Sequence, residues 1–201
     1  MGVTMTHEHL LVDLSVVYEE PTTATGKDFF YKPVSMETIG RIRHYAVPNA
    51  DNYRLFDVPT AIEEVLLYKQ YGGNSLVDAT SIGLSRDPVG LARISRASGV
   101  NVVMGSSYYV YGTHPPEVEG LGEDEVAARI VLDVTEVADG TGIKAGVIGE
   151  IGCSWPLHDR ERKVLRASAQ VQRKTGAPLL IHPGPEERAP LEIIEVLASE
   201  E

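Results

Sequence analysis

Residues 146–156, GVIGEIGCSWP, combine a short apolar run with a carboxylate at its end. Val147 and Ile148 are typical of a strand that is covered on both faces, and Glu150 follows almost directly. A carboxylate is costly to bury without a partner, and a cation is a natural partner for it. The alternative is a glutamate that reaches solvent at a strand end or pairs with a local base. Either way, the stretch indicates a buried strand of an α/β fold.

On both sides of this stretch the sequence alternates between helical and strand patterns. Asp57 with Pro59, and Asp87 with Pro88, are pairs typical of the first turn of a helix. We expect helices over about 57–71, 87–98, 123–138, 159–175 and 189–199, and strands over about 3–6, 75–80, 101–105, 145–151 and 178–182. Because the strands are apolar and alternate with helices, they predict a parallel sheet of five β/α units.

Residues 15–56 break this rhythm, since they are rich in Pro, Thr, Tyr and charge and are too long for an ordinary connection. We expect them to form a rim or lid loop after the first strand. Five units fit an open doubly wound sheet, whereas a closed barrel needs eight and typically ~250 residues. No strand is followed by a glycine-rich phosphate loop, which removes the commonest functional reason for the open sheet.

The composition predicts one soluble domain over residues 1–201, with 43% hydrophobic residues and a net charge of −11. The acidic balance and the absence of basic blocks argue against nucleic acid and anionic membranes as partners. A single cysteine, Cys153, excludes an internal disulfide, and no secretory signal opens the chain. These features favour a cytoplasmic protein that acts on a small molecule, and they leave a homodimer open.

His7-Glu8-His9 ends the first expected strand. Strand side chains alternate, so both imidazoles point to one side and Glu8 points away. Imidazole nitrogen suits zinc and its neighbours, although this pair alone fits a structural role equally well. His182 ends a later strand, as Glu150 does, so three strand ends present His, Glu and His. In parallel α/β folds these ends form the functional face, which favours a metal site.

Four segments resemble the phosphotriesterase-related branch of the phosphotriesterase family, namely residues 6–10 (THEHL), 83–87 (GLSRD), 146–156 and 180–184 (LIHPG). The resemblance runs through nearly the whole chain and implies a (β/α)8 TIM-type barrel, of which about five β/α units are present. It also implies two divalent metal ions, usually zinc. By position, His7 and His9 would hold the first ion, Glu150 would bridge both, and His182 would hold the second.

Two departures from the wider family matter. Glu150 stands where many phosphotriesterases and lactonases have a carboxylated lysine, which argues against organophosphate hydrolysis. The family also takes a metal-binding histidine from strand 6 and a proton-shuttling aspartate from strand 8, and both positions would lie beyond residue 201. His44, His114 and His158 lie in expected loops, so none replaces that histidine. We therefore expect a barrel domain that is incomplete at its C-terminus.

The resemblance implies a hydrolase whose nucleophile is a hydroxide bridging two cations. Its substrate would be a small amide such as an N-acetylated amino or aminosulfonic acid, for example N-acetyltaurine. Ester hydrolysis of the lactonase or phosphotriesterase type, and an inactive fragment without the last ligands, are the alternatives.

Other candidates rank lower. Tyr108 and Tyr109 follow the third strand, where the family often has an aromatic wall of the substrate pocket, and packing explains either residue equally well. Cys153 is interpreted as a buried thiol rather than a nucleophile. Arg86 and Asp87 are assigned to loop geometry and helix capping.

Overall fold

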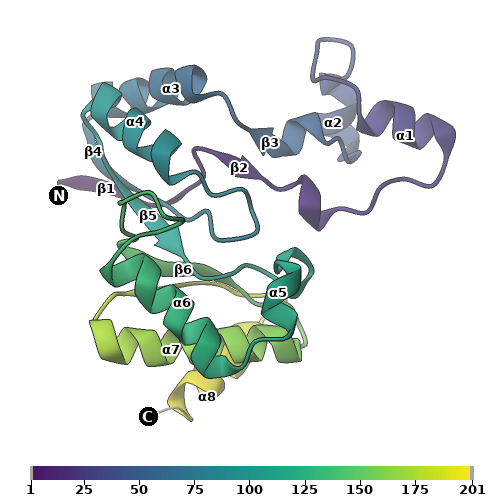
Figure 1. Ribbon diagram of the computed structural model, residues 1–201. Coiled ribbons are helices and arrows are strands. Elements are labelled where there is room, and N and C mark those ends of the chain that lie inside the picture. Colours follow the sequence, from purple (N-terminus) through teal and green to yellow (C-terminus); the bar gives the residue numbers. More distant parts are fainter. Residues whose placement is uncertain (1, 200–201) are drawn as a thin grey trace.

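Five parallel strands lie side by side in the order β1-β4-β5-β6-β7 in the computed structural model, which describes residues 2–199 (Figure 1). They are β1 (Val3–Glu8), β4 (Gly73–Asp78), β5 (Asn101–Ser106), β6 (Val147–Gly152) and β7 (Leu179–His182). Each strand of this sheet joins next to the preceding one, and the order never reverses. A doubly wound sheet reverses its order at a switch point. The order here is that of a barrel wall, which confirms the barrel and excludes the open sheet.

The helices that follow the strands along the chain cover one face of this half-barrel (Figure 1). They are α3 (Val58–Gln70), α4 (Pro88–Ser98), α6 (Glu123–Thr135), α7 (Asp159–Thr175) and α8 (Ala189–Ala198), and a short α5 (Pro116–Glu119) precedes α6. The expected caps are present, since the carboxylates of Asp57 and Asp87 accept hydrogen bonds from the backbone N–H of Thr60 and Gly90. Within residues 2–199, no helix combines the length and apolarity needed to cross a bilayer.

The core lies between the sheet and these helices in two clusters. In one, Ile148 and Ile151 of β6 join Ile130 of α6 and Leu165 of α7, all of them fully buried. In the other, Leu76 of β4 joins residues of α3 and α4. Burial of these apolar side chains fixes the strands against their helices, so the carboxyl ends of the strands are held at one rim.

Residues 15–56 contain more regular structure than the expected loop. They form η1 (Ser15–Val17), α1 (Ala24–Phe30), α2 (Ile39–Tyr45), η2 (Asp51–Tyr53) and β3 (Arg54–Leu55), and β3 pairs antiparallel with β2 (Val12–Asp13). His44 lies within α2, so its expected place in a loop was wrong. The helices hold their own buried side chains, Phe29, Phe30 and Ile42. The segment extends from the rim of the half-barrel (Figure 1).

Candidate metal centre

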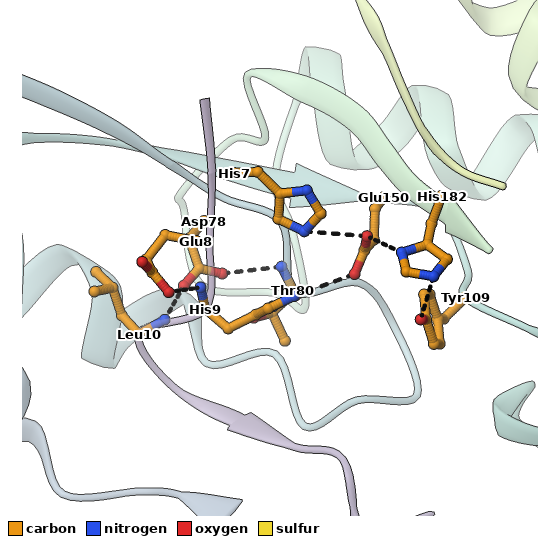
Figure 2. A network of polar contacts seen from close by, with 9 residues as sticks. All are labelled: His7, Glu8, His9, Leu10, Asp78, Thr80, Tyr109, Glu150 and His182. Atoms are coloured by element: carbon orange, nitrogen blue, oxygen red, sulfur yellow. Dashed lines mark hydrogen bonds and ion pairs between the residues drawn. The ribbon is translucent and has the colours of Figure 1, made fainter. Parts of the chain in front are cut away.

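His7 and His9 lie at the carboxyl end of β1, where the pairing of this strand with β4 is irregular. Met5 pairs with Leu76 and Glu8 pairs with Asp78, so between these two pairs β1 contains one residue more than β4. Glu8 lines a cavity together with Met5, and His9 borders the same cavity. Both imidazoles instead point toward Glu150 (Figure 2). The expected division of His7 and His9 from Glu8 is therefore confirmed.

Glu150 collects all three histidines around one carboxylate. Its Oε2 atom lies 3.2 Å from His7 Nε2 and 3.1 Å from His182 Nδ1, and its Oε1 atom lies 3.2 Å from His9 Nε2 (Figure 2). The residue is only 2% exposed. The carboxylate is therefore buried among imidazoles and does not reach solvent at the strand end.

These contacts depend on the curvature of the sheet. In a flat sheet β1 and β6 would be three strand spacings apart, roughly 14 Å, with side chains standing nearly perpendicular to the sheet. The imidazole nitrogens of His7 and His9 nevertheless lie 3.2 Å from the Glu150 oxygens. Only a sheet that curls inward closes such a gap, so the short distances in the site are themselves evidence for the curvature of a barrel wall.

Backbone geometry beside Glu150 requires a glycine. Gly149 has a φ of +135°, and a Cβ atom there would lie 2.1 Å from the carbonyl oxygen of Leu180 in the next strand. The glycine thus allows β6 and β7 to approach closely at the point where their functional side chains begin.

The electrostatics favour an ionised carboxylate. Burial by itself raises the pKa of Glu150, but hydrogen bonds and charge from His182 and His9 outweigh it and lower the pKa to about 2. Burial by itself lowers the pKa of His9, but the hydrogen bond and charge of Glu150, together with the charges of Asp78 and Glu8, raise it above its ordinary value. In the metal-free site the raised pKa of His9 and the lowered pKa of Glu150 therefore favour a protonated His9 ring beside a negative carboxylate.

The same donors fit a divalent cation. The ligand atoms of His7, His9 and Glu150 lie within 4.8 Å of one another, and no other such group occurs in residues 2–199. His182 lies outside this group and contacts Glu150 on the oxygen that also faces His7. Two imidazoles and a carboxylate are a donor set that zinc accepts. Glu150 Oε2 faces His7 and His182 and Oε1 faces His9, so both oxygens of the carboxylate contact imidazole nitrogens.

Tyr109 and Tyr108 lie in different surroundings. The Tyr109 hydroxyl lies 3.1 Å from His182 Nε2, beside the centre. Tyr108 is 1% exposed and belongs to the core cluster of β6, so packing accounts for it.

Two further residues at this rim were not predicted from the sequence. Asp78 ends β4 and Thr80 follows it, and both are fully buried. The Thr80 hydroxyl lies 3.0 Å from His9 Nδ1. A buried acidic residue at a strand end was the available indication, and it has the same form as the one that identified Glu150.

The remaining candidates have structural partners. Cys153 is buried, as expected, and burial above all raises the pKa of its thiol to about 12. Arg86 forms an ion pair with Asp133 at 2.7 Å and also bonds the Gly105 carbonyl, so it holds the loop after β4 against α6. The His158 side chain caps α7.

His114 does not approach the centre. Its Nε2 atom lies 2.8 Å from the Tyr109 carbonyl oxygen, in the segment between η3 (Tyr111–Thr113) and α5. Neither His114 nor the capping His158 therefore supplies the histidine that the sequence lacks.

Comparison with known proteins gives consistent matches. A family model described as the Phosphotriesterase family matches residues 1–201. The phosphotriesterase-related protein of Nematostella vectensis is 42% identical over 200 residues, which cover 98% of this chain and 57% of that protein. The N-acetyltaurine hydrolase of Homo sapiens is 39% identical over 198 residues, with 98% and 56% covered. A crystal structure of a resiniferatoxin-binding protein from Rhodobacter sphaeroides matches with a TM-score of 0.93 and 37% identity, over 99% of this chain and 56% of that one. The chain thus spans little more than half the length of these proteins.

Proposed function

Because the chain belongs to the phosphotriesterase family, we propose that its strand ends form part of a binuclear metal site that hydrolyses a small substrate. His7 and His9 would hold one cation, His182 would hold the other, and Glu150 would be shared between them. The observation that carries this proposal is the buried Glu150 carboxylate, whose two oxygens are divided among three imidazoles.

Zinc is the cation that the donor set favours, since imidazole and carboxylate are its usual ligands beside cysteine. The chemistry that two such cations would supply is a lowered pKa of bound water, which makes it a nucleophile, and polarisation of the substrate's carbonyl oxygen. The chain's own contribution is to hold the four ligands in place and to neutralise charge with Glu150. No residue among 2–199 is assigned the proton transfer to the leaving group.

The proposed substrate is a small amide of the N-acetylated amino or aminosulfonic acid class. The N-acetyltaurine hydrolase of Homo sapiens, one of the relatives, supports this choice by its name. Tyr109 is the proposed substrate contact. Burial, with the charge of Glu150 and the nearby Tyr18 phenol, raises its pKa to about 12, so its hydroxyl remains a hydrogen-bond donor at neutral pH.

Residues 15–56 are proposed as a lid over this site. The beginning of the segment, η1, packs against η3, which directly follows the strand end that carries Tyr109. Tyr18 stacks on Tyr53 with ring centroids 4.0 Å apart. The segment therefore offers aromatic surface at the rim where a small substrate would enter.

Metal content tests the bridging assignment. Purified chain, the Glu150→Ala variant and the matched control Glu63→Gln, which changes an exposed carboxylate on α3, are loaded with zinc and analysed for bound metal. We expect up to two equivalents in the wild type and the control, and a clear loss in Glu150→Ala. Unchanged metal content in Glu150→Ala would overturn the assignment.

Activity is tested on the zinc-loaded chain by the release of acetate from N-acetyltaurine, with a lactone and a phosphotriester as competing substrates. Preference for the amide supports the proposed substrate class. Preference for the lactone or the phosphotriester would overturn the amide proposal in favour of that substrate class. If none of the three is hydrolysed, this chain is inactive by itself.

A further inference from the structure

A chain of buried polar groups stands behind His9 (Figure 2). His9 Nδ1 lies 3.0 Å from the Thr80 hydroxyl, and the Thr80 side chain is in turn hydrogen-bonded to Asp78. The two Asp78 oxygens also accept hydrogen bonds from the backbone N–H groups of Thr80 at 3.1 Å and Leu10 at 2.7 Å. Neither Asp78 nor Thr80 is exposed to solvent.

The direction of these hydrogen bonds follows from what each group can donate. Both Asp78 oxygens face N–H donors, so the carboxylate acts as an acceptor. The Thr80 hydroxyl therefore gives its proton to Asp78 and offers a lone pair to His9. His9 must then carry a proton on Nδ1, which leaves Nε2 as its ligand atom on the side of Glu150.

The same short segment also connects the two ligand-bearing strands through its backbone. The N–H of Ala79 donates to the carbonyl of Glu8 at 2.8 Å, and the Ala79 carbonyl accepts from the N–H of Glu150 at 3.0 Å. Residues 78–80 thus contact the end of β1 on one side and β6 on the other. His7 has a 44% exposed side chain and no comparable partner on Nδ1 within residues 2–199.

We propose that Asp78 and Thr80 are positioning residues that fix the tautomer and ring orientation of His9. The inference rests on the proposed metal function, which it deepens by making His9 the oriented ligand and His7 the less constrained one. Partners of this kind commonly change metal affinity 10- to 100-fold when they are removed, which is an order-of-magnitude guide here.

Zinc affinity gives the first test. Thr80→Val keeps the shape of the side chain and removes the hydroxyl, Thr80→Ser restores the hydroxyl, and Ser81→Ala removes a neighbouring buried hydroxyl that has no hydrogen-bond partner. In competition with a chromophoric chelator, we expect Thr80→Val to weaken zinc binding roughly 10- to 100-fold. Thr80→Ser and Ser81→Ala should remain close to the wild type. Wild-type affinity in a folded Thr80→Val variant would overturn the inference.

A second measurement separates this inference from the proposed function. In metal-free, ¹⁵N-labelled protein at pH 6, the Nδ1–H proton of His9 should give a protected NMR signal that Thr80→Ser keeps and Thr80→Val loses. Absence of the signal in the wild type, or its survival in Thr80→Val, would refute the positioning role. A signal that behaves as expected in a protein that binds no zinc would refute only the metal function.

Discussion

In metal-free protein, Glu150→Gln should remove a pH-dependent contribution to stability. The pKa of Glu150 is about 2 in the folded protein, against 4.5 as its ordinary value. At about 1.4 kcal/mol per pKa unit, the difference corresponds to roughly 3 kcal/mol in the free energy of unfolding. Because the folded-state pKa is the lower one, this contribution is present above pH 4.5 and is lost as the pH falls towards 2.

His9 contributes with the opposite sign. The pKa of His9 is raised above the ordinary 6.5. Its contribution to the free energy of unfolding is therefore fully present below pH 6.5 and is lost as the pH rises through the folded-state pKa. The metal-free site is therefore most stabilising between about pH 4.5 and 6.5. Zinc needs neutral imidazoles, so loading the metal should move the best pH upwards.

Urea unfolding in EDTA measures the effect at pH 5.5 and at pH 3 for the wild type, Glu150→Gln and the control Glu63→Gln. At pH 5.5 the free energy of unfolding of the wild type should exceed that of Glu150→Gln by roughly 3 kcal/mol, in addition to any difference that does not depend on pH. At pH 3 this pH-dependent part should be about half as large. Curves for the two proteins that run parallel between these pH values would refute the reasoning. The control should follow the wild type.

Three further changes have defined outcomes. Cys153, with its pKa raised to about 12 by burial, should react with a disulfide reagent at pH 8 only after denaturation, and rapid reaction of native protein would contradict its burial. Arg86→Met leaves Asp133, 6% exposed, without its cation, and should lower the free energy of unfolding in urea by roughly 3–5 kcal/mol. Gly149→Ala puts a Cβ 2.1 Å from the Leu180 carbonyl oxygen and should therefore lower the melting temperature. A melting temperature equal to that of the wild type would show that the strands can separate there.

The β/α units could be predicted closely because their boundaries are set by local chemistry. Asp87 and Pro88 mark the start of α4, and Gly99 ends it in a left-handed conformation, so the helix occupies Pro88–Ser98 as expected. Sequence length, in contrast, favoured the wrong topology. Strand order is decided by pairing between distant segments, which no local pattern records.

Residues 15–56 show where local signals fail. Helices α1 and α2 are short and have few apolar positions to reveal a period, and α2 begins without a side-chain cap. The pairing of β2 with β3 joins residues 12–13 to 54–55. A two-residue strand gives no alternation to detect, so this part of the rim could be identified by length and composition alone.

The candidate site divides in the same way, between residues proposed to bind metal and residues proposed to orient them. His7, His9, Glu150 and His182 could be identified because imidazole and carboxylate at strand ends are unusual enough to require an explanation. Asp78 lies at an equivalent strand end but gained meaning only from its contacts with Thr80 and Leu10. The contact with Leu10 depends on the pairing of β1 with β4, which no residue type in β1 indicates. An orienting group is thus defined by the pairing of strands, and a search for such groups in related sequences has to begin from the neighbours of each ligand.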